Sequence, residues 1–182
     1  LDSLGGADKI AFIANNNVWM MNIDGSDLLQ LTTDGATKSK LQWLPDNKTL
    51  IYVVGKCVQT MDTEADRVDV LTCFDQAEYF EAFQISPNGE QIAVSLNREL
   101  FIVPLDLEKF SEARDRNHLA AMGGCFYDEV PIRDVRWSND EKQMAVIFLD
   151  VAGSRHIDTI RGMDITKCKS ALPDRLDEFP AE

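Results

Sequence analysis

The sequence contains only two histidines in 182 residues, His118 and His156, and they lie in unrelated contexts. A catalytic triad or a metal site that depends on histidine is therefore not expected. A nucleophile elbow of the form G-x-S-x-G is missing as well, because Ala152 and His156 stand where the glycines on either side of Ser154 would be. The pairs Gly5-Gly6 and Gly123-Gly124 do not connect a strand to a helix as phosphate-binding loops do, so we expect ordinary loops there. We therefore predict no catalytic residues and no enzymatic activity in this segment.

Basic residues are few compared with acidic ones: 18 Lys and Arg stand against 31 Asp and Glu, which gives a formal charge of −13. Binding to nucleic acid or to an anionic membrane needs Lys and Arg gathered on one face, so neither partner is expected. An acidic surface most simply keeps a protein soluble, and cation binding or a basic partner is the alternative.

Long apolar runs are also lacking. The longest, Ile10–Ala14, Leu50–Val54 and Met144–Leu149, suit buried strands and are too short to span a bilayer. The sequence opens with Leu1 and has no basic segment followed by an apolar one. We expect a processed chain or a segment of a longer one, with any targeting signal removed.

One pattern recurs along the chain: an apolar anchor, a tight turn and, seven residues after the anchor, the first core residue of an apolar strand. The anchors are Trp43, Ile85 and Trp137, and the strand-opening residues are Leu50, Ile92 and Met144. Ile10 opens a fourth such strand, and these four openings are 40, 42 and 52 residues apart. Such a period indicates a repeat architecture.

The repeats predict one all-β segment over residues 1–182, made of meandering strands. We expect repeat units at about 8–35, 38–75, 80–126 and 131–169, and a tail or a strand of a following unit at 170–182. The first repeat lacks its first strand. The third carries an insertion at 106–122, expected as a short surface helix or structured loop because Phe110 and Ala113 recur at helical intervals. In the last unit we expect strands at 133–137, 143–150, 156–160 and 163–166.

Meandering four-stranded units of about forty residues are typical of β-propeller blades. The turns after the anchors, with Pro45, Pro87 and Gly89, resemble the W-S-P-D-G-x-x-I-A-F repeat of TolB-like propellers. The segment Val18–Ser26 followed by Leu31-Thr32 is similar to the other half of that repeat. Asn47 and Glu141 stand where the repeat has glycine. The resemblance covers about 150 residues and implies four-stranded antiparallel blades.

TolB-like propellers commonly have six blades, whereas this chain holds about four. The resemblance therefore implies a piece of a larger propeller, or a partial one that another copy or chain completes.

Four cysteines, Cys57, Cys73, Cys125 and Cys168, are too widely spaced for a zinc knuckle. An even number permits two disulfides. If the segment around Thr63–Asp66 is a hairpin turn, Cys57 and Cys73 lie almost opposite each other on its arms and can form a bridge. The alternative is that they are buried thiols acting as small hydrophobic side chains.

No cofactor is expected, and Ca²⁺ is the one ion considered. The acidic turns Asp24–Asp27 and Asp62–Asp66 are its nearest candidates, but neither matches the spacing of a calcium loop, so we interpret both as structural turns. Trp43 and Trp137 are interpreted as packing anchors between blades.

The function expected from these features is a non-enzymatic, TolB-like scaffold that binds a protein, a peptide or another ligand. The location expected is extracytoplasmic: periplasmic, at the cell surface or secreted. Loops at one end of the blades, together with Leu107–Met122, would form the contact surface. Two alternatives remain open: the propeller of a prolyl-oligopeptidase-like serine peptidase, and the sensor ectodomain of a membrane receptor.

Overall fold

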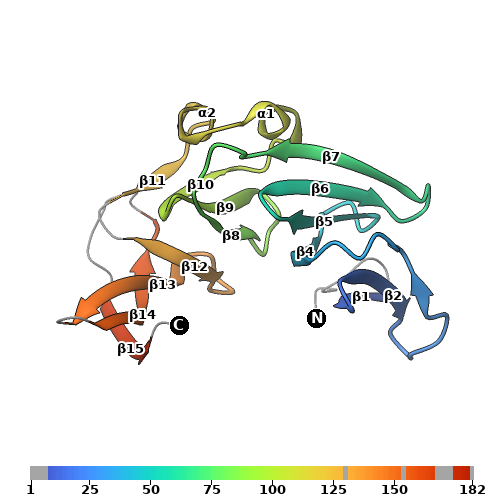
Figure 1. Cartoon of the computed structure of the whole chain (residues 1–182), viewed down its shortest axis with the longest axis horizontal. Coiled ribbons are helices and arrows are strands. Elements are labelled where there is room, and N and C mark those ends of the chain that lie inside the picture. Colours follow the sequence, from blue (N-terminus) through green and yellow to red (C-terminus); the bar gives the residue numbers. More distant parts are fainter. Residues whose placement is uncertain (1–7, 129–130, 153–154, 167–173, 181–182) are drawn as a thin grey trace. The chain divides into compact units, whose positions relative to one another are not determined.

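The computed structural model describes residues 8–128, 131–152, 155–166 and 174–180. It consists of antiparallel β-sheets with two short helices, as Figure 1 shows. The expected all-β fold of the β-propeller class is therefore confirmed. The chain divides into two compact units, residues 1–75 and 76–182, which are described in turn. No helix among the described residues is both long and apolar enough to span a bilayer.

The first sheet of the first unit has three strands, β1 (Lys9–Ala14), β2 (Asn17–Asn22) and β3 (Leu29–Gln30), in the order β1-β2-β3. β1 and β2 are joined by the two-residue turn Asn15-Asn16, in which both residues have positive φ, 50° and 62°. Asparagine tolerates this conformation better than most residues do. From residue 8 onward, where the structure describes the chain, this sheet has no strand that corresponds to the first strand of the later repeats, in agreement with the prediction.

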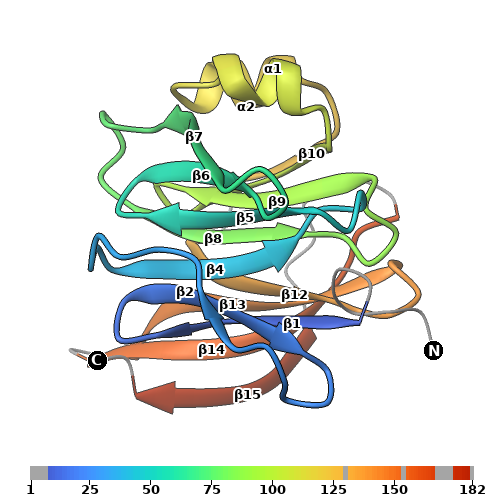
Figure 2. The ribbon, with the colours of Figure 1, turned by 90° about the vertical axis from the view of Figure 1, so that its right-hand side faces the viewer.

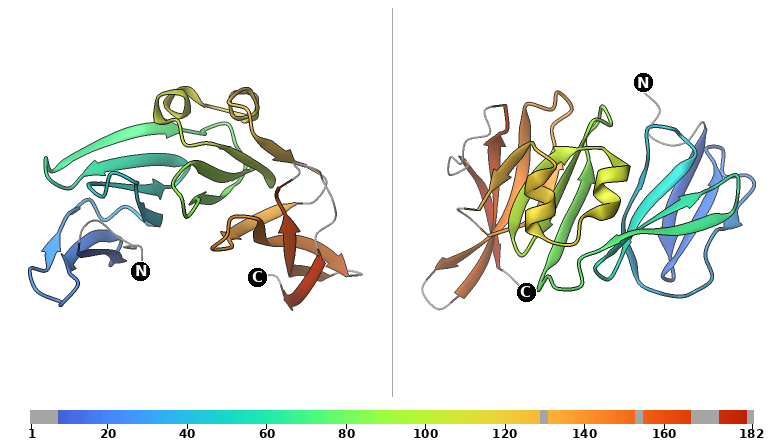
Figure 3. Two further views of the ribbon diagram at one scale, coloured as in Figure 1. Left: turned by 180° about the vertical axis from the view of Figure 1, so that it is seen from behind. Right: turned by 90° about the horizontal axis from the view of Figure 1, so that it is seen from above.

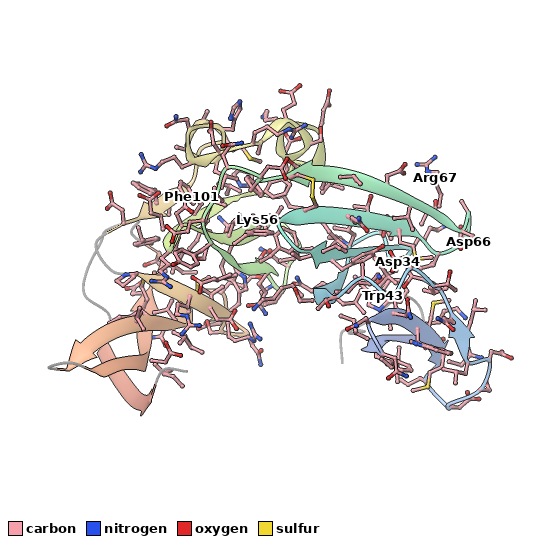
Figure 4. All side chains as sticks on the ribbon, viewed as in Figure 1. Asp34, Trp43, Lys56, Asp66, Arg67 and Phe101 are labelled. Carbon is pink, nitrogen blue, oxygen red and sulfur yellow. A yellow bond between two sulfur atoms is a disulfide. The ribbon has the colours of Figure 1, made fainter. Side chains whose placement is uncertain are left out.

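The second sheet has all four strands, β4 (Lys38–Trp43), β5 (Thr49–Val54), β6 (Cys57–Asp62) and β7 (Arg67–Cys73), in sequence order. Trp43 lies at the end of β4, and Asp66 and Arg67 lie at the far end of the β6–β7 hairpin (Figure 4). The central strand β5 is almost fully buried, whereas the first half of the outer strand β7 is exposed. This gradient is the one expected for a sheet whose central strands form the core.

The third sheet opens the second unit and contains β8 (Phe80–Ile85), β9 (Gln91–Leu96), β10 (Glu99–Pro104) and β11 (Cys125–Tyr127). Two helices, α1 (Leu107–Glu112) and α2 (Arg116–Ala121), interrupt the sequence between β10 and β11. The view from above in Figure 3 shows both helices over the strands of this sheet. The expected helical insertion is therefore confirmed.

The fourth sheet contains β12 (Ile132–Trp137), β13 (Gln143–Ala152), β14 (Arg155–Asp164) and β15 (Asp174–Pro180), visible as a stack of strands in Figure 2. Here the expected strands differ from the structure. Segments 156–160 and 163–166 were expected as separate strands, but one strand, β14, pairs with β13 along its whole length and carries Gly162 opposite Ala145. The fourth strand comes from 174–180, which was expected to be a tail or part of a following unit. Pairing with the long apolar β13 extends the ladder through a glycine that weakens a strand by itself.

Each sheet has two faces, because side chains alternate along a strand. We call the face that carries the strand-opening residue the front face and the other the back face. In the first unit, the front face of the second sheet (Leu50, Tyr52 and Met61) packs on Val18 and Ala11 of the back face of the first. The second unit repeats this arrangement with a larger set of residues. Its front-face residues are Val135, Met144, Val146, Phe148 and Met163, and its back-face residues are Ala82, Ala93, Leu100, Ile102 and Tyr127.

Candidate binding surface

The serine and the Asn or Asp of the repeated motif hold its turn together. Ser86 Oγ donates to Asn88 Oδ1 (2.7 Å) and accepts from the backbone N–H of Gln91 (3.0 Å). Ser138 Oγ makes the same two bonds, to Asp140 Oδ1 (2.6 Å) and from Gln143 N (3.0 Å). The motif therefore closes a strand-to-strand turn, and its polar atoms are used inside the turn.

The position after this Asn or Asp requires a left-handed backbone in all three complete sheets. φ is 56° at Asn47, 73° at Gly89 and 58° at Glu141. In the first of these turns Leu44 stands in place of the serine, and Thr49 Oγ1 bonds to the Asp46 carboxylate instead (2.6 Å). Different residues thus produce one turn, with Pro45 and Pro87 exposed at its tip.

The anchors end the first strand of their sheets. Trp43 lies opposite Leu50, Ile85 opposite Ile92, and Trp137 opposite Met144. Trp137 Nε1 also donates to the backbone oxygen of Gln84 in the neighbouring sheet (3.4 Å). Each anchor therefore belongs to a strand pair of its own sheet, and Trp137 also contacts the neighbouring sheet.

The two acidic turns use their carboxylates for backbone contacts. Asp24 Oδ1 accepts from the hydroxyl (2.6 Å) and the N–H (2.9 Å) of Ser26, and these bonds lower the pKa of Asp24. Asp62 Oδ1 accepts from the N–H groups of Glu64 and Ala65 (both 2.9 Å), which lowers its pKa in the same way. These oxygens are occupied in turn formation, which is the role the sequence predicted.

Among the described residues, one group of potential metal ligands is compact: Cys57, Cys73 and Asp75. The two sulfurs are bonded to each other, so they are not available as thiolate ligands. His118 is exposed on α2, with Nδ1 2.9 Å from Asp115 Oδ1. Ser154 and the side chain of His156 lie outside what the structure describes.

A disulfide joins Cys57 on β6 to Cys73 on β7, directly opposite each other with Cα atoms 4.0 Å apart. The prediction of this bridge is confirmed. Cys125, on β11, is also disulfide-bonded. Cys168 lies outside the described residues.

A cluster of four charged side chains joins the two sheets of the second unit, and no sequence pattern predicted it. Arg133 donates to Glu81 (3.1 Å) and to both oxygens of Asp158 (each 2.9 Å), and Arg98 donates to Glu81 (3.4 Å). Burial of the guanidinium opposes its charge, but the bonds to Asp158 and Glu81 outweigh burial and raise the pKa of Arg133. Arg98 also lies over the ring of Tyr79, 4.0 Å from its centroid. The two sheets are thus fixed by polar bonds as well as by the core.

The helical insertion is tied firmly to the third sheet. Each helix starts at an aspartate that caps it, Asp106 for α1 and Asp115 for α2. Phe110 is fully buried and its ring centroid lies 6.0 Å from that of Phe83 on β8. Arg116 of α2 bonds to Glu99 on β10 (2.7 Å). The insertion is therefore a fixed part of the unit, anchored at both helices.

The outer side of the insertion presents polar groups of both charges to solvent. We define the insertion surface as its exposed polar residues Glu108, Lys109, Glu112, Arg114, Arg116, Asn117 and His118. Donors and acceptors held on a docked pair of helices can contact a partner with little ordering on binding. Of the three complete sheets, only the third carries a helical insertion among the described residues, so this surface is the strongest candidate for contact with a partner.

No protein-family model matches the chain, and neither does any curated protein. Solved structures do match. The chain is similar to hydrazine synthase from Kuenenia stuttgartiensis, with TM-score 0.60, 13% identity, and coverage of 94% of this chain and 47% of that one. In a nidogen/laminin complex the match has TM-score 0.56, 11% identity, and coverage of 96% and 60%. For the tricorn protease the values are TM-score 0.54, 17% identity, and coverage of 92% and 16%.

At these identities the likeness concerns the fold alone, and it agrees with the blade-type sheets described above. The chain spans 16%, 60% and 47% of the lengths of the tricorn protease, nidogen/laminin and hydrazine synthase chains that it matches. It thus corresponds to less than two thirds of each.

Proposed function

We propose that this chain is a non-enzymatic, TolB-like propeller scaffold that binds a protein partner through the insertion surface on α1 and α2. The observation that carries the proposal is the docked insertion: one repeat departs from the others, and its extra residues are fixed by Phe110 and by the Arg116–Glu99 pair. Repeat proteins concentrate binding in such insertions. The serine- and Asn- or Asp-containing turns support the TolB type of repeat.

We propose an extracytoplasmic location for the scaffold. The Cys57–Cys73 bridge supports it, because disulfides persist in oxidising compartments and are rare in the cytosol. The structural match within a nidogen/laminin complex is compatible with a protein partner.

Two charge-reversal variants test the surface. Partners are captured by chemical cross-linking from an extracytoplasmic extract, purified, and titrated against the wild type, Glu112→Arg on α1 and Asp66→Arg at the β6–β7 turn. Both replaced carboxylates are exposed. Because Asp66 has φ 50°, which arginine adopts less readily than aspartate, circular dichroism first checks that the control variant folds. We expect Glu112→Arg to change the Kd of the genuine partner by about tenfold or more and Asp66→Arg to leave it unchanged.

An equal effect of both variants, or a partner whose binding does not saturate, would contradict the assignment of the surface. Turnover of peptide substrates by the purified chain would contradict the non-enzymatic part of the proposal.

A further inference from the structure

The front face of the first sheet is exposed where its counterparts are buried. Ile10 on β1 is 37% exposed, whereas Leu50, Ile92 and Met144 at the same position of the other three sheets are each 0% exposed. Phe12, two residues further on, is also partly exposed, while its counterpart Tyr52 is fully buried. The front face of the first sheet is therefore apolar and partly exposed, whereas the corresponding residues of the other sheets are buried.

Exposed apolar side chains concentrate on this sheet. Seven large hydrophobic residues are exposed among the described ones, and four of them belong to the first sheet or its turn: Ile10 and Ile23 on the front face, Leu28 in the turn, and Leu29 on the back face beside Met20. Ile23 directly follows β2 and is 70% exposed. Gathered aliphatic exposure of this kind marks an interaction site more often than isolated exposed residues do.

The back face of the fourth sheet is also more exposed than the corresponding face of the third sheet. Ala145 and Ile147 on β13 and Ile160 on β14 are partly exposed. Their counterparts in the third sheet, Ala93, Ser95 and Leu100, are all 0% exposed. On this face the apolar residues of β13 and β14 lie beside the Arg136–Asp134 pair of β12. It belongs to the fourth sheet, whereas the first exposed face belongs to the first sheet.

The two exposed faces are the two halves of one interface that the chain already contains twice. In each unit a front face packs on the back face of the preceding sheet, in a cluster that holds residues at matching positions: Leu50 and Val18 in the first unit, and Met144 and Leu100 in the second. Within the described residues, the front face of the first sheet and the back face of the fourth sheet are the exposed faces identified above. Another copy of the chain offers both complementary surfaces.

We propose that copies of this chain associate head to tail, with the front face of β1–β2–β3 in one copy packed on the back face of the β12–β15 sheet in the next. The interface is heterologous, since different surfaces of the two copies meet. It extends the interface seen within each unit, and it does not depend on the insertion surface.

Sedimentation velocity over a range of concentrations tests the proposal on the purified chain. We expect the mean mass of the wild type to rise with concentration. Ile10→Asp on the front face and Ala145→Glu on the back face should each raise the apparent Kd of association at least about tenfold. The control is Val70→Asp on β7, which replaces a residue that is 61% exposed and lies on neither surface; it should associate like the wild type.

Mixing the variants distinguishes head-to-tail contact from a symmetric one. Ile10→Asp keeps an intact back face and Ala145→Glu an intact front face, so an equimolar mixture should form a 1:1 dimer that neither variant forms alone. Far-UV circular dichroism checks that each variant folds. Ile23→Asp, at a residue that is 70% exposed, repeats the front-face test with little risk to folding.

A wild-type chain that stays monomeric up to about 1 mM overturns the proposal. So does association that Val70→Asp abolishes and that Ile10→Asp and Ala145→Glu leave intact, or a mixture that fails to form the dimer while each folded variant is monomeric. Any of these outcomes leaves the insertion surface of the proposed function untouched, so the two proposals can fail separately.

Discussion

At the residue scale, the adjacent glycines before β11 differ in what they require. A Cβ at Gly124, where φ is 103°, would lie 2.1 Å from the backbone oxygen of Ile102, whereas a Cβ at Gly123, where φ is 83°, would meet no atom within 4 Å. We predict that Gly123→Ala costs about 1 kcal/mol, from backbone strain alone. Gly124→Ala should lower the free energy of unfolding by at least about 3 kcal/mol, because the pairing of β10 with β11 must also be distorted to make room for the Cβ.

Urea unfolding of both variants measures this difference. Equal destabilisation by the two substitutions would show that the chain can shift away from Ile102 at little cost. It would then contradict a close approach at Gly124.

The repeated turns also make a prediction about pH. The hydroxyl of Ser138 and then the N–H of Lys142 donate to Asp140, and they lower its pKa below the ordinary value of 3.8. A carboxylate with a lowered folded pKa stabilises the fold above its unfolded pKa, and this contribution is lost as the pH falls through the folded pKa. Acid below about pH 4 should therefore lower the Tm of the wild type.

Asp140→Asn should reduce that acid-induced fall in Tm while leaving the turn closed. An amide oxygen accepts the same bonds at any pH, as Asn88 does in the equivalent turn. Thermal melting at pH 7, 5 and 3 checks this. An unchanged acid response in the variant would show that other carboxylates set it.

At the element scale, the Cys57–Cys73 bridge holds the exposed strand β7 to the sheet. The bridge closes a loop with a sequence separation of 16, for which the chain-entropy account gives a stabilisation of about 3 kcal/mol. We predict that the double substitution Cys57→Ala/Cys73→Ala lowers the free energy of unfolding by about that amount. Val70→Ala on the same strand should change it by less than about 0.5 kcal/mol.

Urea denaturation of the two variants side by side provides the test. A loss below about 1 kcal/mol for the double variant would mean that β7 is held by its backbone ladder and packing alone.

The elements that were predicted correctly are those whose sequence signals lie within a short stretch of the chain. The strands that open at Ile10, Leu50, Ile92 and Met144 were predicted because each has its own apolar run and turn. The Cys57–Cys73 bridge was predicted because both cysteines belong to one hairpin. The strand or turn that such a local pattern favours is also the one present in the folded chain.

Elements whose form depends on distant partners were missed. Strands were predicted at 156–160 and 163–166, but pairing with β13 continues β14 through the residues between them, including Gly162. The polar cluster was missed because Glu81 and Arg133 are 52 positions apart, and because Arg133 and Asp158 are 25 apart. Nothing local distinguishes these charges from solvated ones.

At the scale of the whole molecule, the formal charge of −13 should set how association responds to salt. Two copies repel each other through this charge, while the proposed interface is apolar. Salt shortens the Debye length from about 10 Å at 0.1 M to about 3 Å at 1 M. We therefore predict that the Kd of association falls several-fold as NaCl rises from about 0.05 M to 0.5 M.

Sedimentation velocity of the wild type at both salt concentrations checks this. Weaker association in high salt would instead indicate that ion pairs between copies hold the contact, in conflict with the apolar interface.

The place where α1 and α2 enter and leave the third sheet has a consequence for engineering. β10 and β11 are adjacent strands, with Ile102 opposite Cys125, so the two ends of the inserted segment emerge about 5 Å apart. Closing a longer or shorter segment across such a gap changes the free energy only slowly with length. This junction is therefore a natural site for grafting a foreign peptide or for opening new chain termini, with the strand register on either side preserved.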